Sequence, residues 1–129
     1  MGRGLALRLS LMHDVWLGSR RIEKAGAGSR EYGSGARGFY GNRMTGSIKG
    51  ALNSDIPPLV EVVFLTLPPR YAIDTVRQIK DKLTCQHIII STIVPMAKEG
   101  KLFTYSPIIA SGKIGVEKSA AELVADEVG

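Results

Sequence analysis

With 129 residues, of which 44% are hydrophobic and 22% charged, the chain is long enough for one globular domain and too short for two. No apolar run reaches the roughly 18 residues of a membrane span, and a single cysteine, Cys85, excludes a disulfide framework, so we expect a cytoplasmic protein without a membrane partner. Residues 1–50 carry nine basic and three acidic residues, a net charge of +6, which favours a phosphorylated cofactor over nucleic acid because no dense basic stripe or nucleic-acid motif is present.

The chain begins with a predicted helix and a predicted strand. Apolar residues recur at helical spacing over residues 3–12, which predicts a helix with one main buried face. Its expected buried stripe consists of Leu5, Ala6, Leu9 and Met12. Residues 14–18 contain three apolar residues in a row and predict a short strand.

A basic and glycine-rich segment follows that strand. Ser19 is expected to cap a helix over residues 20–32, because a serine hydroxyl often accepts a backbone N–H at a helix start. Residues 33–38 are expected to hold no regular structure, because glycine disfavours the interior of helices and strands. One short strand is expected within residues 44–49.

The second half of the chain alternates strands and helices more cleanly. Residues 59–67 and 87–93 are nearly continuous apolar runs, which predict two buried strands. Residues 70–83 between them show helical spacing, and residues 116–126 predict a last amphipathic helix. Strands that are apolar on both faces and alternate with helices are typical of a parallel sheet covered on both sides. We therefore expect one α/β domain, residues 1–129.

The ends of the predicted strands indicate where a ligand would bind. In an open parallel α/β sheet, ligands bind beyond the carboxyl ends of the strands. Three such ends can be identified, at residues 18–20, 66–68 and 91–95. We expect all three to line one edge of the sheet.

The first of these ends carries a basic cluster. In a dinucleotide-binding fold, an acidic residue after the second strand binds the ribose 2′-hydroxyl of NAD. This chain instead has Ser19, Arg20 and Arg21, with Lys24 one turn further on. Arginine can bind a phosphate with two hydrogen bonds, and a helix N-terminus adds favourable partial charge. The cluster indicates the 2′-phosphate of NADP, with a solvated basic helix start as the alternative.

Several segments resemble one known family. Gly2-Arg-Gly-Leu-Ala-Leu-Arg-Leu9 and Gly18-Ser-Arg-Arg-Ile-Glu-Lys24 are similar to segments of the archaeal-type NADPH-dependent reductases of the deazaflavin coenzyme F-420. Further segments that match the same family in the same order are Ala72-Ile-Asp-Thr75, Val94-Pro95, Phe103-Thr-Tyr105 and Lys118-Ser-Ala-Ala-Glu-Leu-Val124. The resemblance covers nearly the whole chain and implies an oxidoreductase with a Rossmann fold that uses NADP and coenzyme F-420.

The same resemblance implies that the chain is a fragment. Family members begin with a strand and a Gly-Gly-Thr-Gly-x-x-Gly loop, whose backbone N–H groups cradle the pyrophosphate. Met1 and Gly2 match only the last two positions of that loop. Members also continue past the last helix into a region that completes the deazaflavin pocket and a homodimer. The expected fold is therefore a Rossmann-like parallel sheet that lacks its first strand and most of the glycine loop.

The resemblance also implies roles for residues of the first half. Ser19, Arg20 and Lys24 would hold the 2′-phosphate of NADP. Arg21 lies beside them and would join the same group. Gly2 would allow close contact between a helix and a strand.

Residues of the second half would border the reacting rings. By resemblance, Thr66, Leu67 and Pro68 would lie along the nicotinamide, and Val94 and Pro95 would border the cleft between the two cofactors. A hydride passes directly between those cofactors, so no catalytic acid or base is expected. No metal site is expected either, because the histidines lack partners at metal-ligand spacing.

Two other interpretations stay open. One is another NADP-dependent reductase of the same fold, similar to pyrroline-5-carboxylate reductase. The other is an inactive remnant, because strands beside a missing first strand would leave buried backbone groups unpaired. Each such group costs roughly 1–3 kcal/mol, against a total domain stability of about 5–15 kcal/mol. A cooperative thermal transition of the chain would argue against the remnant.

Overall fold

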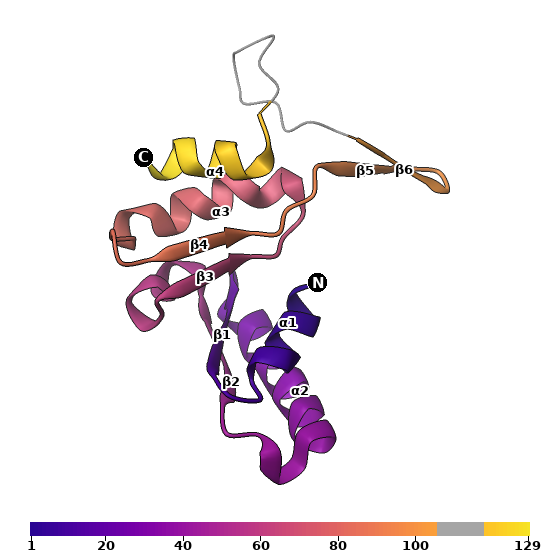
Figure 1. Cartoon of the computed structure of the whole chain (residues 1–129), viewed down its shortest axis with the longest axis vertical. Coiled ribbons are helices and arrows are strands. Elements are labelled where there is room, and N and C mark those ends of the chain that lie inside the picture. The colour runs from indigo at the N-terminus through magenta and orange to yellow at the C-terminus, as the bar shows by residue number, and fades with distance from the viewer. Residues whose placement is uncertain (106–117) are drawn as a thin grey trace. The chain divides into compact units, whose positions relative to one another are not determined.

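A computed structural model describes residues 1–105 and 118–129 (Figure 1). Within these residues, α-helices connect the strands of each parallel pair, and the strands form two parallel pairs and one antiparallel pair. The fold is therefore of the predicted α/β, Rossmann-like class. The chain divides into two compact units, Met1–Val60 (the N-terminal unit) and Glu61–Gly129 (the C-terminal unit), which are described in turn. None of the described helices is both long and apolar enough to cross a membrane.

The N-terminal unit is a parallel strand pair with two helices. Its elements are α1 (Gly2–Leu9), β1 (Asp14–Ser19), α2 (Ile22–Tyr40) and β2 (Ser47–Leu52). β1 pairs with β2 along its whole length, and α2 makes the crossover between them. α1 and α2 lie on the same side of the strands (Figure 1). Because the strands are parallel, Ser19 and Leu52 end at the same edge of the pair.

Helix α2 runs straight through the glycine-rich segment. It continues to Tyr40, so the expectation of no regular structure at residues 33–38 is wrong. Tertiary packing offsets the low helix propensity of glycine, because Ala25 and Ala36 are buried. A Cβ added at Gly50 of β2 would collide with the carbonyl oxygen of Ala25, so the helix backbone lies directly on the strand.

The first helix ends earlier than predicted. It stops at Leu9, and Met12 is exposed instead of completing the buried stripe. Ser10 is fully buried just after the helix, and its hydroxyl donates a hydrogen bond to the carbonyl oxygen of Leu7. This local bond satisfies a carbonyl of the last turn, and the chain leaves the helix there. β1 confirms the predicted strand, and β2 begins within residues 44–49 but runs past them.

The C-terminal unit contains a second parallel pair and a hairpin. Its elements are β3 (Val62–Leu65), α3 (Ala72–Ile79), β4 (Ile88–Ser91), β5 (Met96–Glu99), β6 (Leu102–Tyr105) and α4 (Ala120–Val128). β3 and β4 are parallel, and β5 and β6 form an antiparallel hairpin. α3 and α4 lie together on one side of the β3–β4 pair (Figure 1).

Among the described residues, those of the C-terminal unit cover one face of the β3–β4 pair. Val63 and Leu65 of β3 are buried. The residues of the opposite face, Val62, Ile88 and Ile90, are 39%, 58% and 37% exposed, and we call them the open face. The sequence predicted strands buried on both faces, and for the open face this prediction is wrong. Periodicity cannot show which apolar face finds a cover.

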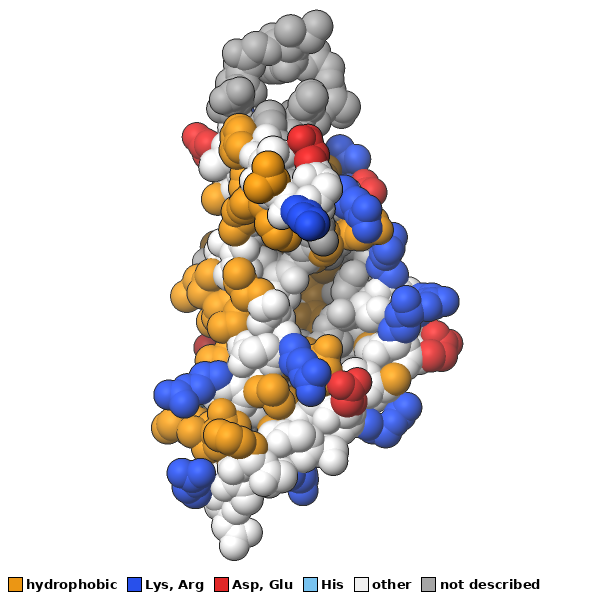
Figure 2. Space-filling view, turned by 90° about the vertical axis from the view of Figure 1, so that its right-hand side faces the viewer, with side chains coloured by type: hydrophobic (Ala, Val, Ile, Leu, Met, Phe, Trp, Pro, Cys, Tyr) orange, Lys and Arg blue, Asp and Glu red, His pale blue; other side chains and the backbone are white. Residues whose placement is uncertain are grey.

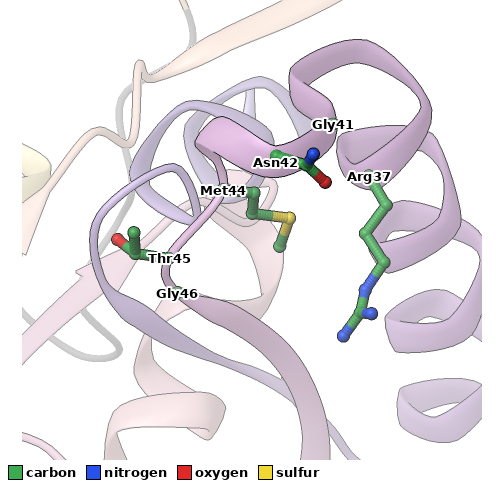
Figure 3. Close-up of a pocket in the computed structure, with 6 residues that line it drawn as sticks. All are labelled: Arg37, Gly41, Asn42, Met44, Thr45 and Gly46. Carbon is green, nitrogen blue, oxygen red and sulfur yellow. The ribbon is translucent and has the colours of Figure 1, made fainter.

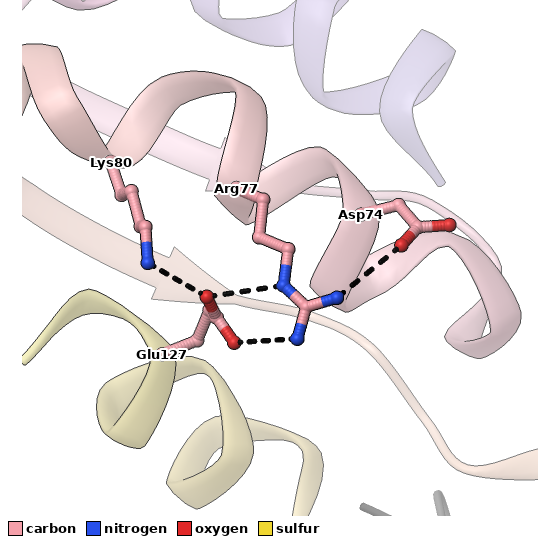
Figure 4. A network of polar contacts seen from close by, with 4 residues as sticks. All are labelled: Asp74, Arg77, Lys80 and Glu127. Atoms are coloured by element: carbon pink, nitrogen blue, oxygen red, sulfur yellow. Dashed lines mark hydrogen bonds and ion pairs between the residues drawn. The ribbon is translucent and has the colours of Figure 1, made fainter. Parts of the chain in front are cut away.

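An ionic cluster joins α4 to α3 and the turn after it. The Glu127 carboxylate accepts hydrogen bonds from Lys80 Nζ at 2.9 Å and Arg77 Nη2 at 3.3 Å, and Arg77 Nη1 lies 4.0 Å from Asp74 (Figure 4). The Glu127 side chain is only 17% exposed. Hydrogen bonds from Lys80, and then from Arg77, hold the pKa of its carboxyl below the ordinary value. We call these four residues the helix clamp.

The remaining predictions for this unit are confirmed in part. The helix predicted at residues 70–83 is α3 with a 3₁₀ turn at each end. The last helix begins after Ser119, whose hydroxyl forms a capping box with Glu122. The first two residues of the predicted range 116–126 lie outside the described part of the chain. The β5–β6 hairpin was not predicted, although Gly100 opens its two-residue loop at a φ of +63°.

Candidate functional site

The basic cluster lies in the turn between β1 and α2. β1 ends at Ser19 and α2 begins after Arg21, so Arg20 and Arg21 form the whole connection. Ser19 is not the helix cap that the sequence predicted, because the cap position belongs to Arg21. Instead, Ser19 Oγ accepts the backbone N–H of Arg21 at 3.2 Å. This hydrogen bond closes the turn between β1 and α2. We call Ser19, Arg20 and Arg21 the basic turn.

Positive charge gathers around the basic turn. Arg20, Arg21 and Lys24 are exposed, and Glu23 is the one acidic residue of residues 19–24, so this segment has a formal charge of +2. Lysine and arginine side chains occur at several places on the face shown in Figure 2. The N-terminus of α2, which has no side-chain cap hydrogen bond, adds positive potential. The turn therefore offers an anion both charge and backbone donors.

The end of β2 lies directly beside the basic turn. Asn53 follows β2 and is half-buried. Its Oδ1 lies 2.6 Å from where a Cβ on Gly18 would be, so the amide fits there only because residue 18 has no side chain. Sequence reasoning missed Asn53 because it ended the strand at residue 49. A polar residue directly after a parallel strand is the signal that could have identified it.

Two segments that the sequence predicted as site residues follow the two strands of the β3–β4 pair in the C-terminal unit. Residues 66–68 follow β3, and residues 94–95 come shortly after β4. Thr92 ties the two strand ends together, because its N–H and Oγ1 donate to the Leu65 carbonyl oxygen at 3.2 and 3.0 Å. Their expected common edge is confirmed within this unit. The half-buried members are Thr66, Leu67 and Pro95, and the exposed members are Pro68 and Val94.

The basic turn and these two segments belong to different units. Their expected meeting at one edge therefore stays a prediction. Gly2 is the first residue of α1. Its expected role in a close contact between helix and strand also stays a prediction.

His87 and Cys85 of the C-terminal unit both lie at the turn before β4. The Nδ1 atom of His87 accepts the backbone N–H of Thr84 at 2.9 Å, across the turn before β4. Cys85 is exposed in the same turn. Within residues 1–105 and 118–129, no three His, Cys, Asp or Glu side chains gather as a metal site would require.

A hollow in the N-terminal unit lies away from the basic turn (Figure 3). It is lined by Arg37 and Gly41 near the end of α2 and by Thr45 and Gly46 before β2. The hollow therefore lies at the amino edge of the β1–β2 pair, whereas the basic turn lies at the carboxyl edge.

Comparisons with known proteins bear on these residues. A sequence model of the family described as NADP oxidoreductase coenzyme F420-dependent matches residues 1–95. The chain is also 35% identical over 97 residues to the F420-dependent NADP reductase of Methanocaldococcus jannaschii. That stretch covers 74% of this chain and 41% of the relative, so the chain spans less than half the length of the curated relative that it matches. The family match includes the basic turn and both C-terminal segments.

Proposed function

The chain belongs to the family of coenzyme F420-dependent NADP oxidoreductases, and from this premise we propose that it supplies most of the NADP-binding side of an enzyme that transfers a hydride between NADP(H) and coenzyme F-420. The observation that carries the proposal is the basic turn at the carboxyl edge of the β1–β2 pair. That edge is where parallel α/β sheets bind their ligands.

The basic turn fits a phosphate monoester in charge and in donor type. Arg20 and Arg21 each carry a planar guanidinium that can bind two phosphate oxygens, and Lys24 adds a point charge. Ser19 uses a lone pair for the Arg21 N–H, so its own O–H can donate to a phosphate oxygen. No acidic side chain stands at residues 19–21 to select the free 2′-hydroxyl of NAD. The turn therefore favours the 2′-phosphate of NADP.

The second part of the proposed site is the pair of segments after β3 and β4. Both leave one sheet edge, and most of their side chains are apolar. We assign Thr66, Leu67 and Pro68 to the nicotinamide side and Val94 and Pro95 to the border of the cleft between the cofactors. An apolar lining positions a ring and excludes water from it.

The proposed reaction needs no general acid or base from the protein. NADP and coenzyme F-420 supply the hydride donor and acceptor when both are bound. The chain's own residues bind the phosphate, orient the ring and keep water away. No catalytic acid or base is assigned for this reason.

The phosphate assignment is tested by Arg20→Ala. Loss of a charged hydrogen-bond donor should weaken NADPH binding about 10- to 100-fold and leave NADH binding within about twofold. Energy transfer from Trp16, the one tryptophan, to the reduced nicotinamide reports both nucleotides. Arg37→Ala, an exposed arginine at the opposite edge, is the matched control and should change neither affinity. Equal losses for NADPH and NADH in Arg20→Ala would contradict the assignment.

The second substrate is tested by a hydride-transfer assay. With NADPH as the donor, coenzyme F-420 and pyrroline-5-carboxylate are offered in parallel as acceptors to the protein that carries this chain. We expect NADPH absorbance to fall with the deazaflavin and to stay constant with the imine. The reverse result would make the protein an imine reductase and would leave the NADP assignment intact.

A further inference from the structure

The Asn53 side chain lies beside Gly18, where the two strands of the N-terminal unit end. Gly18 pairs with Ala51, and Ser19 with Leu52, as the last pairs of the β1–β2 ladder. Asn53 is thus the first residue beyond the ladder on β2. It leaves the sheet at the same edge as the basic turn.

The side chain of Asn53 occupies space that residue 18 leaves empty. Its Oδ1 is 2.6 Å from a Cβ placed on Gly18, and its Cγ is 3.7 Å from that point. A real Cβ does not approach an oxygen this closely, so an alanine at position 18 would displace the amide of Asn53. The Asn53 side chain therefore packs at this place because residue 18 is a glycine.

The contact between Asn53 and Gly18 lies directly next to the basic turn. Gly18 is the residue before Ser19, and Ser19 Oγ accepts the Arg21 N–H at 3.2 Å. The turn thus has an internal hydrogen bond, and the residue directly before it, Gly18, has the Asn53 side chain beside it. Hydrogen bonds to a phosphate are sensitive to misplacement of the donors, because their strength falls with distance and angle.

We propose that Asn53 is a positioning residue that holds the basic turn in its phosphate-binding geometry by packing against Gly18. The proposal rests on the proposed function, because it concerns how well the turn binds the 2′-phosphate. A purely structural Asn53 would instead support the fold of the whole unit. The two roles differ in their effect on NADPH relative to NADH.

The test compares both nucleotides in Asn53→Ala. We expect NADPH binding to weaken about tenfold, as when a charged hydrogen bond loses its geometry, and NADH binding to stay within about twofold. Asn42→Ala is the matched control, because Asn42 is the other asparagine of the chain and lines the hollow at the opposite edge. Equal weakening of both nucleotides, or no change in either, would overturn the proposal.

A size exchange tests the contact itself. Gly18→Ala should lower the NADPH preference because the new Cβ pushes the amide of Asn53 away. In the double variant Gly18→Ala, Asn53→Ala, the smaller residue 53 makes room for that Cβ, so we expect NADPH binding to recover in part. Additive losses in the double variant would show that the two residues act independently and would overturn the proposed contact.

A measurement without cofactor separates this proposal from the proposed function. Hydrogen exchange of the Arg21 amide, which is bonded to Ser19 Oγ, should become faster in Asn53→Ala. The amide of Val76 in the C-terminal unit should exchange as in the unmodified chain. If the unmodified chain shows no preference for NADPH, the proposed function fails. If Arg21 exchange is unchanged in Asn53→Ala, the positioning role fails.

Discussion

At the scale of single residues, two glycines are needed because a Cβ at their positions would overlap neighbouring atoms. Gly18 leaves room for the amide of Asn53, and Gly50 lets the backbone of α2 lie directly on β2. By contrast, Gly33, Gly35 and Gly38 of α2 face open space, where a Cβ would meet nothing within 4 Å. The first two glycines are needed for packing, whereas the last three only lower helix propensity.

This contrast predicts opposite effects of the same substitution. Gly35→Ala should raise the free energy of unfolding by about 0.5–1 kcal/mol, because alanine is the better helix former and nothing obstructs its Cβ. Gly50→Ala should lower it by about 1–3 kcal/mol, because its Cβ meets the backbone of Ala25. Urea unfolding followed by circular dichroism measures both values. A Gly35→Ala chain less stable than the unmodified one would contradict the placement of that glycine.

The residues of the proposed phosphate site were predictable to different degrees. The basic turn could be predicted, because a run of apolar residues followed by Ser19, Arg20 and Arg21 places those side chains at a strand end without any tertiary information. Asn53 could not, because its role depends on where β2 ends and on how β2 pairs with β1. Sequence spacing does not fix that register.

At the scale of elements, α4 is held by one local and one tertiary device. The capping box of Ser119 and Glu122 satisfies donors at its start, and the Ser119 hydrogen bonds hold the pKa of the Glu122 carboxyl below its ordinary value. The helix clamp then fixes its last turn through Glu127 to Arg77 and Lys80. Hydrogen bonds of a capping box thus stabilise the start of α4, and ion pairs with α3 and the turn after it stabilise its end.

The helix clamp predicts a loss of stability in acid. The pKa of Glu127 is lowered in the folded chain from its ordinary value of 4.5, so the clamp stabilises the fold at a pH above that value. The contribution falls as the pH drops from about 4.5 through the lower folded pKa. Glu127→Gln should therefore flatten the acid limb of a plot of melting temperature against pH.

Two further variants make this test specific. Arg77→Met and Lys80→Met should each flatten the same limb, because each removes a donor to the Glu127 carboxylate. Combined with Glu127→Gln, they should add little more, since the shared interaction is already lost. Unchanged acid limbs in all three single variants would exclude a role for the clamp.

The elements were predictable where the pattern was long and regular. The helical spacing of residues 70–83 and of residues 116–126 identified α3 and α4, in which Ala72, Val76, Leu123 and Val124 are buried. The path of α2 through its glycines was not predictable, because burial of Ala25 and Ala36 overrides local propensity. The β5–β6 hairpin was missed because strands of four residues carry too few alternations to stand out.

At the scale of the whole chain, charge and apolar surface are unevenly distributed. Residues 1–60 hold nine basic and four acidic residues, whereas residues 61–129 hold eight of each, so the net charge of +5 comes from the N-terminal unit. The C-terminal unit carries the open face of Val62, Ile88 and Ile90. A unit without net charge that exposes large apolar side chains is prone to association.

The open face predicts a gain in solubility from polar substitution. Ile88→Thr and Ile90→Thr keep the β-branched shape that suits a strand and remove exposed apolar area. We expect less light scattering at high protein concentration and a melting temperature within a few degrees of the unmodified chain. Ile89→Thr, on the opposite side of the same strand, is the control and should lower the melting temperature instead. Unchanged scattering in the first two variants would show that the open face does not drive association.

Each unit is also one continuous stretch of chain, which matters during synthesis. The contacts that build the N-terminal unit all lie within residues 1–60. At roughly 5–20 residues per second, a ribosome takes about 3–14 s to add residues 61–129, much longer than collapse or helix formation requires. The basic turn and Asn53 beneath it can therefore reach their folded arrangement on the nascent chain. Under the proposed function, a nucleotide in the cell can then meet that turn while the second unit is still being translated.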